Sequence, residues 1–266
     1  MKYAVLTVFV FFINFAFSAQ TTKAPKIVVG IVIDQMCYDY LYRFSHVYTT
    51  GGFNRLMSKG TNCRNTQYNY VPTYTAPGHA SIYTGTTPSN HGIVGNDWYV
   101  RDLKKTVTSV SDTRYTTVGS LTGGQAAPLN LLTYTITDQL KMASPQSKVI
   151  SISIKDRGAI LPGGHLSDGS YWYDYTSGDF VTSTFYTDAL PSWVGRFNAK
   201  FDPSKDLRTW RLLLPESTYL MADASPYEVV LTGKSSATFP YDFPAMKAAG
   251  ATANNLFTIS PQANEI

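Results

Sequence analysis

The stretch Ile27-Val28-Val29-Gly30-Ile31-Val32-Ile33, followed directly by Asp34, decides the fold class of this chain. The run is continuously apolar and rich in β-branched residues, a pattern typical of a strand that is buried on both faces of a parallel sheet. Residues 148–154 form a second run of this kind. Helical patterns separate and flank the two runs, at residues 35–44, 51–59, 128–142 and, after a turn, from near Pro77 to Thr84. Strands that alternate with helices predict an α/β fold with a mainly parallel sheet flanked by helices.

The composition is that of a folded globular protein. Of the 266 residues, 44% are apolar and 15% are charged, which is enough apolar material for a large core and argues against disorder. The length suits one large domain or two modest ones. The formal net charge is +4, and the lysines and arginines are scattered along the chain, so no nucleic-acid partner is predicted.

The first residues have the pattern of a secretory signal peptide. Lys2 precedes an almost unbroken apolar run at residues 4–17, and Ala16-Phe17-Ser18-Ala19 has the small residues of a cleavage site. The alternative, a membrane anchor, needs about 20 apolar residues, and this run is shorter. We therefore expect residues 1–18 to be a signal peptide, the mature protein to be periplasmic or secreted, and no stable membrane span to be present.

Export makes a disulfide between Cys37 and Cys63 permissible. Two cysteines are too few for a disulfide framework, and their spacing is not that of a zinc finger. Two separate small core residues are the simpler interpretation, and the sequence leaves both open.

The character of the sequence changes near residue 163. From residue 163 to 240 it consists of short aromatic and Thr/Ser-rich stretches, punctuated by glycine and proline. This pattern predicts an insertion or cap and not a further strand–helix repeat. Residues 241–266 are expected to return toward the core. Because no closing strand or helix follows, we expect the fold to be incomplete at the C-terminus.

Polar residues at the ends of the two apolar runs are candidates for a binding site, because ligands of open α/β sheets bind at the carboxyl ends of the strands. Asp34 is either a metal ligand or the N-cap of the helix that follows. Lys155 and Arg157 share a face if the second strand continues through them, and two cations there would clamp a phosphate or sulfate. An ordinary solvated strand exit is the alternative.

Two further polar residues lie between the apolar runs. Thr75 precedes a helix that Pro77 starts, where free N–H groups attract anions. It is either a nucleophile, which requires a metal ion to activate its hydroxyl, or an ordinary N-cap. Asn96, in a turn after Gly92-Ile93-Val94-Gly95, is either an amide donor to an oxyanion or simply a turn residue.

The order of these pieces along the chain carries more information than any one of them. The apolar run ending in Asp34 is followed by Pro72-Thr73-Tyr74-Thr75-Ala76-Pro77-Gly78-His79, by His91-Gly92-Ile93-Val94-Gly95-Asn96 and by Lys155-Asp156-Arg157. This series closely resembles the phosphate-irrepressible alkaline phosphatases, exported phosphomonoesterases of the alkaline phosphatase superfamily that are related to the nucleotide pyrophosphatase/phosphodiesterases. The resemblance covers residues 26–165 and continues more loosely to the end. It implies an alkaline-phosphatase-like fold in which residues 26–162 are the N-terminal part of the catalytic domain.

The resemblance implies a role for each of five residues. Asp34 matches a zinc-ligand aspartate, and Thr75 matches the nucleophile, which also binds zinc. Asn96 matches an amide that contacts a phosphoryl oxygen. Lys155 and Arg157 match the cationic pair that marks the monoesterases and that the diesterases lack. The family thus implies small phosphate monoesters as substrates, two zinc ions as cofactors and a phospho-threonine intermediate.

The chain departs from the family in its length. The family's remaining zinc ligands, further Asp and His residues, lie in a C-terminal half that this sequence lacks, so the chain by itself is expected to be inactive. Its four histidines are His46, His79, His91 and His165, and none of them matches a ligand. We interpret His79 and His165 as structural or as supports of the site. Two other hypotheses stay open: a nucleotide pyrophosphatase/phosphodiesterase of the same superfamily, and a non-catalytic, truncated binding protein. The sequence does not predict the oligomeric state.

Overall fold

The computed structural model of the protein describes residues 25–264. The expected signal peptide, residues 1–18, lies outside the described residues. The chain divides into two units, residues 1–33 and 34–266, and the second contains every helix and strand assigned in the described part. No helix of residues 25–264 is long and apolar enough to cross a membrane.

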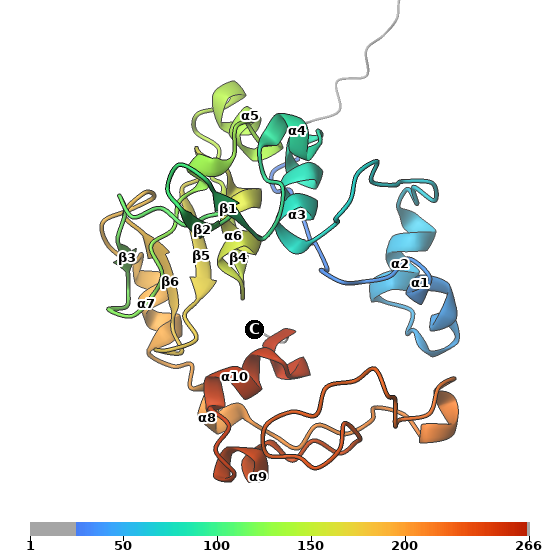
Figure 1. The fold of residues 1–266 in the computed structure, drawn as a ribbon. Helices are drawn as coiled ribbons and strands as arrows, with labels where there is room; N and C mark the ends of the chain where they lie inside the picture. The colour runs from blue at the N-terminus through green and yellow to red at the C-terminus, as the bar shows by residue number, and fades with distance from the viewer. Residues whose placement is uncertain (1–24, 265–266) are drawn as a thin grey trace, which may run out of the picture. The chain divides into compact units, whose positions relative to one another are not determined.

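Short helices and strands build the second unit (Figure 1). The α-helices are α1 (Tyr40–Arg43), α2 (Gly52–Lys59), α3 (Thr75–Thr84), α4 (Pro88–His91), α5 (Ile136–Ala143), α6 (Asp156–Gly163), α7 (Ser192–Asn198), α8 (Pro203–Asp206), α9 (Phe243–Ala248) and α10 (Ala253–Thr258). The strands are β1 (Asp97–Val100), β2 (Lys105–Thr108), β3 (Thr117–Val118), β4 (Ile150–Ser153), β5 (Gly169–Tyr173) and β6 (Phe180–Ser183). The 3-10 turns are Ser45–Val47, Pro128–Asn130, Glu216–Thr218 and Pro261–Asn264.

The strand predicted at residues 27–33 is not formed. These residues have no helix or strand assignment, and Ile27, Val28, Val29 and Ile31 are each at least 70% exposed. The prediction of this strand was wrong, because apolar character favours burial but a strand also needs a neighbour that completes its hydrogen bonds. None of the ladders found within residues 25–264 includes this run.

The larger sheet has four strands in the order β3-β6-β5-β4. Strand β4 pairs with β5 in parallel, with Ile150 opposite Gly169 and Ser153 opposite Trp172. The pairings of β5 with β6 and of β3 with β6 are antiparallel. The predicted α/β class is confirmed, but the sheet of the described residues is mixed and not mainly parallel. The difference arises because β5 and β6 form a hairpin, whose turn Gly178 permits with a φ of 82°.

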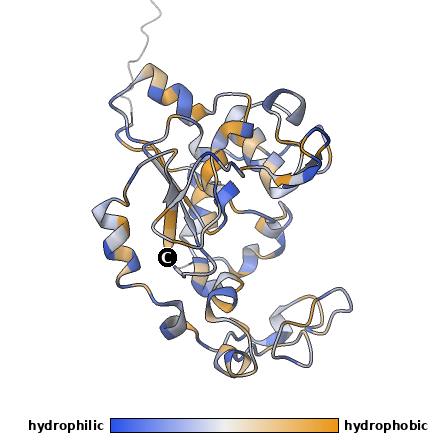
Figure 2. Ribbon diagram, turned by 60° about the vertical axis from the view of Figure 1, so that its left-hand side comes forward, coloured by the Kyte–Doolittle hydropathy of each residue, from blue (hydrophilic) through white to orange (hydrophobic). Residues whose placement is uncertain are grey.

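Helices α3 and α6 pack against each other, and α6 also packs on β4 and β5. The core that they share contains small side chains, Ala76 and Ala80 of α3 and Ala159 of α6, all fully buried. Gly158 permits close approach of α6 to the strand, since a Cβ there would lie 2.5 Å from Ser153 Oγ. Larger members of this core are Ile93, Val110, Leu131, Ile160, Leu161, Trp172 and Val181. Figure 2 shows apolar and polar positions mixed along most helices, as amphipathic elements require.

A second buried cluster joins the β5–β6 hairpin to the C-terminal helices. Tyr171, Tyr173 and Phe180 of the hairpin pack in one cluster with Phe243 of α9 and Phe257 of α10. The hairpin therefore belongs to the sheet of β4 and also carries the C-terminal helices. The expected division into a catalytic domain at residues 26–162, a cap at 163–240 and a return at 241–266 stays a prediction.

The predicted helices agree with the structure in part. Helix α2 ends at Lys59, directly before Gly60, as expected. The segment 35–44 contains only the four-residue α1. The segment 128–142 divides into a 3-10 turn and α5, because Thr135 accepts a hydrogen bond from the Asp138 amide and starts the helix there as a capping box.

Cys37 and Cys63 are both free and both exposed. The structure therefore contains neither the disulfide nor the pair of core residues that the sequence left open. The neighbouring helices α1 and α2 have no buried residue, so this part of the chain offers the two thiols no core to enter.

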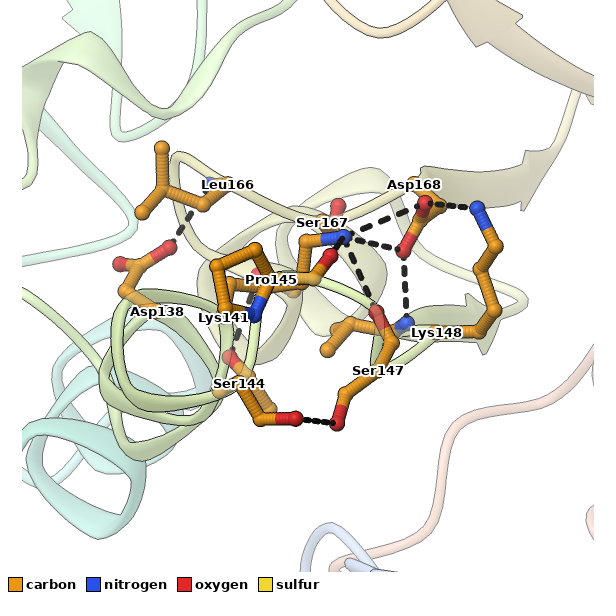
Figure 3. Close-up of polar contacts among 12 residues, drawn as sticks. Asp138, Lys141, Ser144, Pro145, Ser147, Lys148, Leu166, Ser167 and Asp168 are labelled. Atoms are coloured by element: carbon orange, nitrogen blue, oxygen red, sulfur yellow. Dashed lines mark hydrogen bonds and ion pairs between the residues drawn. The ribbon is translucent and has the colours of Figure 1, made fainter.

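Asp168 ties the amino-terminal end of β4 to α5 (Figure 3). Its carboxylate accepts hydrogen bonds from Lys148 Nζ at 2.9 Å, from Lys141 Nζ at 3.2 Å and from the Val149 amide at 2.8 Å. Lys141 also donates to two backbone carbonyls of residues 145–147. Two cations and one carboxylate thus form a closed structural cluster at this end of the strand.

Candidate active site

Thr75 is the first residue of α3, and its hydroxyl contacts Asp34. Thr75 Oγ1 donates a hydrogen bond to Asp34 Oδ2 at 2.8 Å. Tyr74 occupies the N-cap position without a side-chain cap, so the interpretation of Thr75 as an N-cap is wrong. The helix starts two residues before Pro77, because a proline in the first turn replaces an N–H that has no partner within the helix. Asp34 is not an N-cap either, since α1 begins only at Tyr40.

Asn96 is fixed by a hydrogen bond to the first turn of the same helix. Its side-chain Oδ1 accepts from the Ala76 amide at 2.9 Å. This contact defines the orientation of the amide group, because a backbone N–H requires the oxygen as its acceptor. The Nδ2 end is then the end that remains to donate, which agrees with the role of an amide donor to an oxyanion.

Lys155 and Arg157 lie at the start of α6 and not on a continued strand. Strand β4 ends at Ser153, whose Oγ accepts from the Lys155 amide at 3.3 Å, and the helix begins at Asp156. The predicted extension of the strand through Arg157 was wrong, because the chain turns into a helix directly after β4. The two cations still come together, now through the N-cap and the first turn of a helix.

A cavity of about 280 Å³ unites most of the predicted site. Thr75, Asn96, Lys155 and Arg157 all line it, although they come from α3, from the turn before β1 and from α6. Its remaining lining residues are Gly123, Gly124, Asp156, Trp172, Tyr173, Asp174 and Tyr175. Asp34 is not among the lining residues and is connected to the cavity only through its hydrogen bond to Thr75.

Positive charge gathers on the side of the cavity where the two helices begin. Both α3 and α6 start there, and the N-terminal end of a helix carries partial positive charge. Lys155 is exposed and has no ion pair within the part of the chain that the structure describes. The Arg157 guanidinium has one ion-pair contact, at 3.4 Å, with the adjacent Asp156. Cations with so little compensation suit an anion of the size of phosphate.

Asp34 and Thr75 offer two oxygen donors that a metal ion would accept as ligands. A zinc site needs three or four protein ligands. Residues 25–264 contain no group of three or more His, Cys, Asp or Glu side chains placed to hold a metal ion. The described residues therefore present two oxygen donors without the further ligands that a metal ion such as zinc requires.

Two histidines that the sequence analysis interpreted as structural are held by backbone oxygens. His79 Nδ1 lies 2.8 Å from the carbonyl oxygen of Thr75, and because a carbonyl only accepts, this nitrogen carries the proton. His165 Nε2 lies 3.0 Å from the Leu131 carbonyl, and its Nδ1 lies 3.3 Å from Asp138 Oδ2. Neither ring lines the cavity, so the geometry agrees with a structural role for both.

His91 is fully buried and belongs to a hydrogen-bonded chain behind α3. The Ile93 amide donates to its Nδ1 at 3.1 Å, so the proton is on Nε2, which lies 3.0 Å from Ser81 Oγ. Ser81 Oγ in turn lies 2.7 Å from the Tyr70 hydroxyl. Burial lowers the pKa of His91 and favours the neutral ring that this pattern requires.

The end of β5 contributes a wall of the cavity that was not predicted from the sequence. Asp174 and Tyr175 follow the strand directly and line the cavity. A signal was present in the sequence, because the aromatic run Tyr171-Trp172-Tyr173 is followed by a turn that contains Gly178. Such a pattern predicts a hairpin, but the same composition also suits a cap, which is how we had interpreted it.

Comparisons with known proteins agree with this geometry. Residues 28–222 match the type I phosphodiesterase / nucleotide pyrophosphatase family. Alkaline phosphatase PhoV of Synechococcus elongatus is 51% identical over 229 residues, which are 84% of this chain and 42% of that protein. Alkaline phosphatase PafA of Elizabethkingia meningoseptica is 47% identical over 232 residues, again 84% of this chain and 42% of that protein.

Solved structures of an alkaline phosphatase also match this chain. The crystal structure of wild-type alkaline phosphatase PafA matches with a TM-score of 0.86 and 44% identity, over 92% of this chain and 48% of that chain. A PafA mutant in which a threonine, an asparagine, a lysine and an arginine are replaced, in that order along the chain, matches with a TM-score of 0.82 and 42% identity, over 88% of this chain and 46% of that chain.

The chain spans about half the length of the curated relatives it matches. The resemblance inferred from the order of the motifs is confirmed by the family match and by the relatives. The chain belongs to the type I phosphodiesterase / nucleotide pyrophosphatase family, and the relatives it matches at 47–51% identity are alkaline phosphatases.

Proposed function

We propose that this chain carries the nucleophile and the phosphate-binding half of an exported hydrolase of phosphate monoesters. Thr75 is the nucleophile, and Asn96, Lys155 and Arg157 bind the non-bridging oxygens of the phosphoryl group. The observation that carries the proposal is that these four residues, far apart in sequence, line one cavity of about 280 Å³. The PafA mutant adds support, because the residue types replaced in it are the same four in the same order.

The proposed reaction has two steps. Thr75 Oγ1 attacks phosphorus, a new O–P bond forms, and the bond from phosphorus to the leaving oxygen breaks, which gives a phospho-threonine and an alcohol. Water then cleaves the phospho-threonine and releases phosphate. Asp34 accepts the Thr75 hydroxyl proton in a hydrogen bond of 2.8 Å and so directs the lone pairs of Oγ1 away from itself. The proton that Thr75 Oγ1 loses balances the one that the leaving oxygen takes up to become the alcohol, and the water of the second step supplies the proton that restores the Thr75 hydroxyl.

Zinc is the cofactor that the proposal requires. Asp34 and Thr75 fit as two of its oxygen ligands, and zinc bound there would stabilise the alkoxide form of Thr75. Residues 25–264 contain no group of three or more His, Cys, Asp or Glu side chains placed to hold a metal ion. We therefore propose that the catalytic protein is longer than this chain and that the chain alone is inactive.

The cationic pair favours a monoester over a diester. A phosphate monoester is a dianion, whereas a diester carries a single charge. Lys155 has no ion pair in the described residues, and Arg157 has one contact of 3.4 Å. The two side chains can therefore provide the positive charge that a dianion needs. A diesterase gains less from such a pair, because one oxygen of its substrate carries a second substituent.

Hydrolysis of phenyl phosphate and of its diester, methyl phenyl phosphate, by the full-length protein with zinc tests the proposal. We expect the monoester to react far faster than the diester. Thr75→Ala should reduce phosphate release by several orders of magnitude and abolish the covalent phospho-enzyme, because no other group replaces an essential nucleophile. Thr75→Ser is the matched control, since it keeps a hydroxyl at the same place.

Three results would contradict the proposal. Faster hydrolysis of the diester would make the protein a nucleotide pyrophosphatase/phosphodiesterase. Full activity of Thr75→Ala would place the nucleophile elsewhere. Phosphate binding without turnover by the full-length protein would favour a non-catalytic binding protein.

Export is the second part of the proposal, and the signal-peptide pattern of residues 1–18 supports it. The test is expression of the natural protein in a Gram-negative host, followed by fractionation of periplasm and cytoplasm. We expect a periplasmic product that has lost its first residues, and a cytoplasmic product when residues 2–18 are deleted. An uncleaved product in the cytoplasm would contradict export.

A further inference from the structure

Asp174 is a buried carboxylate at the cavity that the proposed reaction does not use. It is 7% exposed and follows β5 directly. Its oxygens accept hydrogen bonds from Ser120 Oγ at 2.6 Å, Thr122 Oγ1 at 3.0 Å, Ser177 Oγ at 2.9 Å and the Thr176 amide at 3.1 Å. These donors offset the cost of taking the carboxylate out of water, and they fix its position at the cavity.

The donors come from two segments that both form walls of the cavity. Ser120 and Thr122 belong to a loop at residues 119–124, whose Gly123 and Gly124 line the cavity. Thr176 and Ser177 belong to the turn of the β5–β6 hairpin. Tyr175, in the same turn, lines the cavity. Asp174 therefore joins two walls that are more than 50 residues apart in the chain.

The carboxylate serves as an acceptor and not as an acid. Burial raises the pKa of Asp174, but the hydrogen bonds from Ser120, Thr176, Ser177 and Thr122 outweigh burial, and the pKa lies below its ordinary value. The group stays ionised at neutral pH. Its charge faces donors of the loop and the turn, so these contacts offset its repulsion of a phosphate in the same cavity.

The loop depends on Asp174 for its position. Residues 119–124 form no helix or strand, and Leu121 at its tip is fully exposed. Apart from the two bonds to Asp174, its side-chain anchor is the hydrogen bond from Thr117 Oγ1 to the Gly124 carbonyl at 2.9 Å. Gly119 fixes the entry to the loop, because its φ is 104° and a Cβ there would lie 2.6 Å from Leu190 Cδ1.

The part of the cavity next to Asp174 differs from the part that binds phosphate. Thr75, Asn96, Lys155 and Arg157 are the proposed phosphate-binding part. The other lining residues are two carboxylates, Asp156 and Asp174, and a set of glycines and aromatic residues: Gly123, Gly124, Trp172, Tyr173 and Tyr175. Flat, weakly polar walls of this kind suit an apolar, planar leaving group.

We propose that Asp174 is a positioning residue that holds the 119–124 loop and Tyr175 as the walls of a leaving-group site, and so makes the enzyme prefer aryl over small alkyl phosphate monoesters. This inference rests on the proposed monoesterase activity. Asp174 acts through the loop and the turn and does not itself touch the phosphate.

The experiment compares two ways of removing the same contacts in the full-length protein. Asp174→Asn replaces an acceptor oxygen by a donor, and the pair Ser120→Ala with Thr122→Val removes the donors on the exposed loop. Leu121→Ala is the matched control, since it changes the same loop without a contact to Asp174. For each protein, kcat/KM is measured for phenyl phosphate and methyl phosphate, with the inhibition constant of inorganic phosphate and hydrogen–deuterium exchange of residues 119–125.

We expect the phenyl-to-methyl ratio of kcat/KM to fall about tenfold in Asp174→Asn and in the loop variant, the loss that removed hydrogen bonds to a charged group produce. The inhibition constant of phosphate should change less than the ratio, and residues 119–125 should exchange faster. Combining all three substitutions should add little, because both variants break the same contacts. Leu121→Ala should keep the wild-type ratio.

Each other outcome decides against the inference. Equal losses on both esters, with unchanged exchange of the loop, would mean that Asp174 supports only general stability. A loss confined to Asp174→Asn and absent from the loop variant would mean that the carboxylate acts without the loop. A wild-type protein that hydrolyses neither ester would refute the proposed function, and with it this inference, whereas a normal wild-type rate with an unchanged ratio refutes the inference alone.

Discussion

At the amino-terminal end of β4, Lys141 and Lys148 share the Asp168 carboxylate (Figure 3). At the carboxyl end of the same strand, Lys155 has no ion pair within residues 25–264, and Arg157 has a single contact of 3.4 Å with its neighbour Asp156. Each end thus presents two cations and one carboxylate. The first set is closed upon itself, and the second set faces a cavity.

The difference lies in where the carboxylate is placed. Asp168 directly precedes β5, the neighbour of β4, and its carboxylate contacts both Lys141 and Lys148. Asp156 directly precedes Arg157 in the same helical turn, and its Oδ1 lies 3.4 Å from Arg157 Nε. Cations that the fold satisfies contribute to stability, and cations that it leaves open are available to a ligand. The same residue types therefore predict opposite effects of substitution at the two ends.

The largest effect is expected at the open end. Replacing both Lys155 and Arg157 by Ala should lower kcat/KM for a phosphate monoester, by about 1.5–3 kcal/mol for each lost charged contact. The diesterase activity should fall much less, because a diester has one charge fewer to satisfy. Steady-state kinetics with phenyl phosphate and methyl phenyl phosphate measure both, and thermal unfolding should show a Tm close to that of the wild type.

Lys141→Ala, at the closed end, is the matched control for that experiment. It removes one cation, where the double variant removes two, and it should lower Tm and leave kcat/KM per folded molecule unchanged. Equal losses on monoester and diester in the double variant would show that the open cations are structural, and the contrast between the two ends would be lost.

The next effect concerns Asp168 itself. Asp168→Ala leaves the Val149 amide without its acceptor and removes one acceptor from each of the two lysines, and should lower the free energy of unfolding by about 1–3 kcal/mol. Urea denaturation followed by circular dichroism measures the change. A variant as stable as the wild type would mean that water replaces the carboxylate fully at this end.

The contribution of Asp168 should depend on pH. Burial raises the pKa of this carboxyl, but the hydrogen bonds from Val149, Lys148 and Lys141 outweigh burial, and the pKa lies below its ordinary value. Its stabilising effect is therefore fully present above the unfolded value of about 3.9 and is lost as the pH falls through the lower folded value. The difference in unfolding free energy between wild type and Asp168→Asn should shrink below pH 4. A difference that stays constant down to pH 2 would contradict this.

The sequence grouped the candidate site residues better than it predicted the fold. Thr75, Asn96, Lys155 and Arg157 were singled out by the order of their motifs, and all four line one cavity, whereas their catalytic roles stay a proposal. Their local structure was not predictable: Arg157 lies in α6, because the chain turns into a helix directly after β4, and the Lys155 amide donates to Ser153 Oγ at this turn.

Asp174 was missed for a physical reason. Its function depends on Ser120 and Thr122, more than 50 residues earlier, and on a hairpin whose aromatic strands resemble a cap in composition. The run at residues 27–33 was misjudged for the converse reason. Its composition specifies burial, but pairing is decided by segments elsewhere.

The smallest effect is expected for Lys148. Its side chain is 79% exposed, whereas that of Lys141 is 16% exposed and has two further carbonyl acceptors. Lys148→Ala should change the unfolding free energy by less than about 1 kcal/mol, and Lys141→Ala by more. Denaturation of the two variants side by side measures the order. The reverse order would show that exposure does not decide the value of an ion pair in this cluster.

The parallel pair β4 and β5, with α6 between them, has a consequence for how the site assembles during folding. Lys155 and Arg157 belong to this single strand–helix–strand segment, which spans residues 150–173 and brings together partners that are near in sequence. Thr75 and Asn96 come from the chain before it and join only when α3 docks on α6. Contacts that are close in sequence form faster than distant ones. We therefore expect the cationic pair to be in place before Thr75 and Asn96 arrive, so that a refolding chain binds phosphate weakly before the rest of the proposed site is assembled.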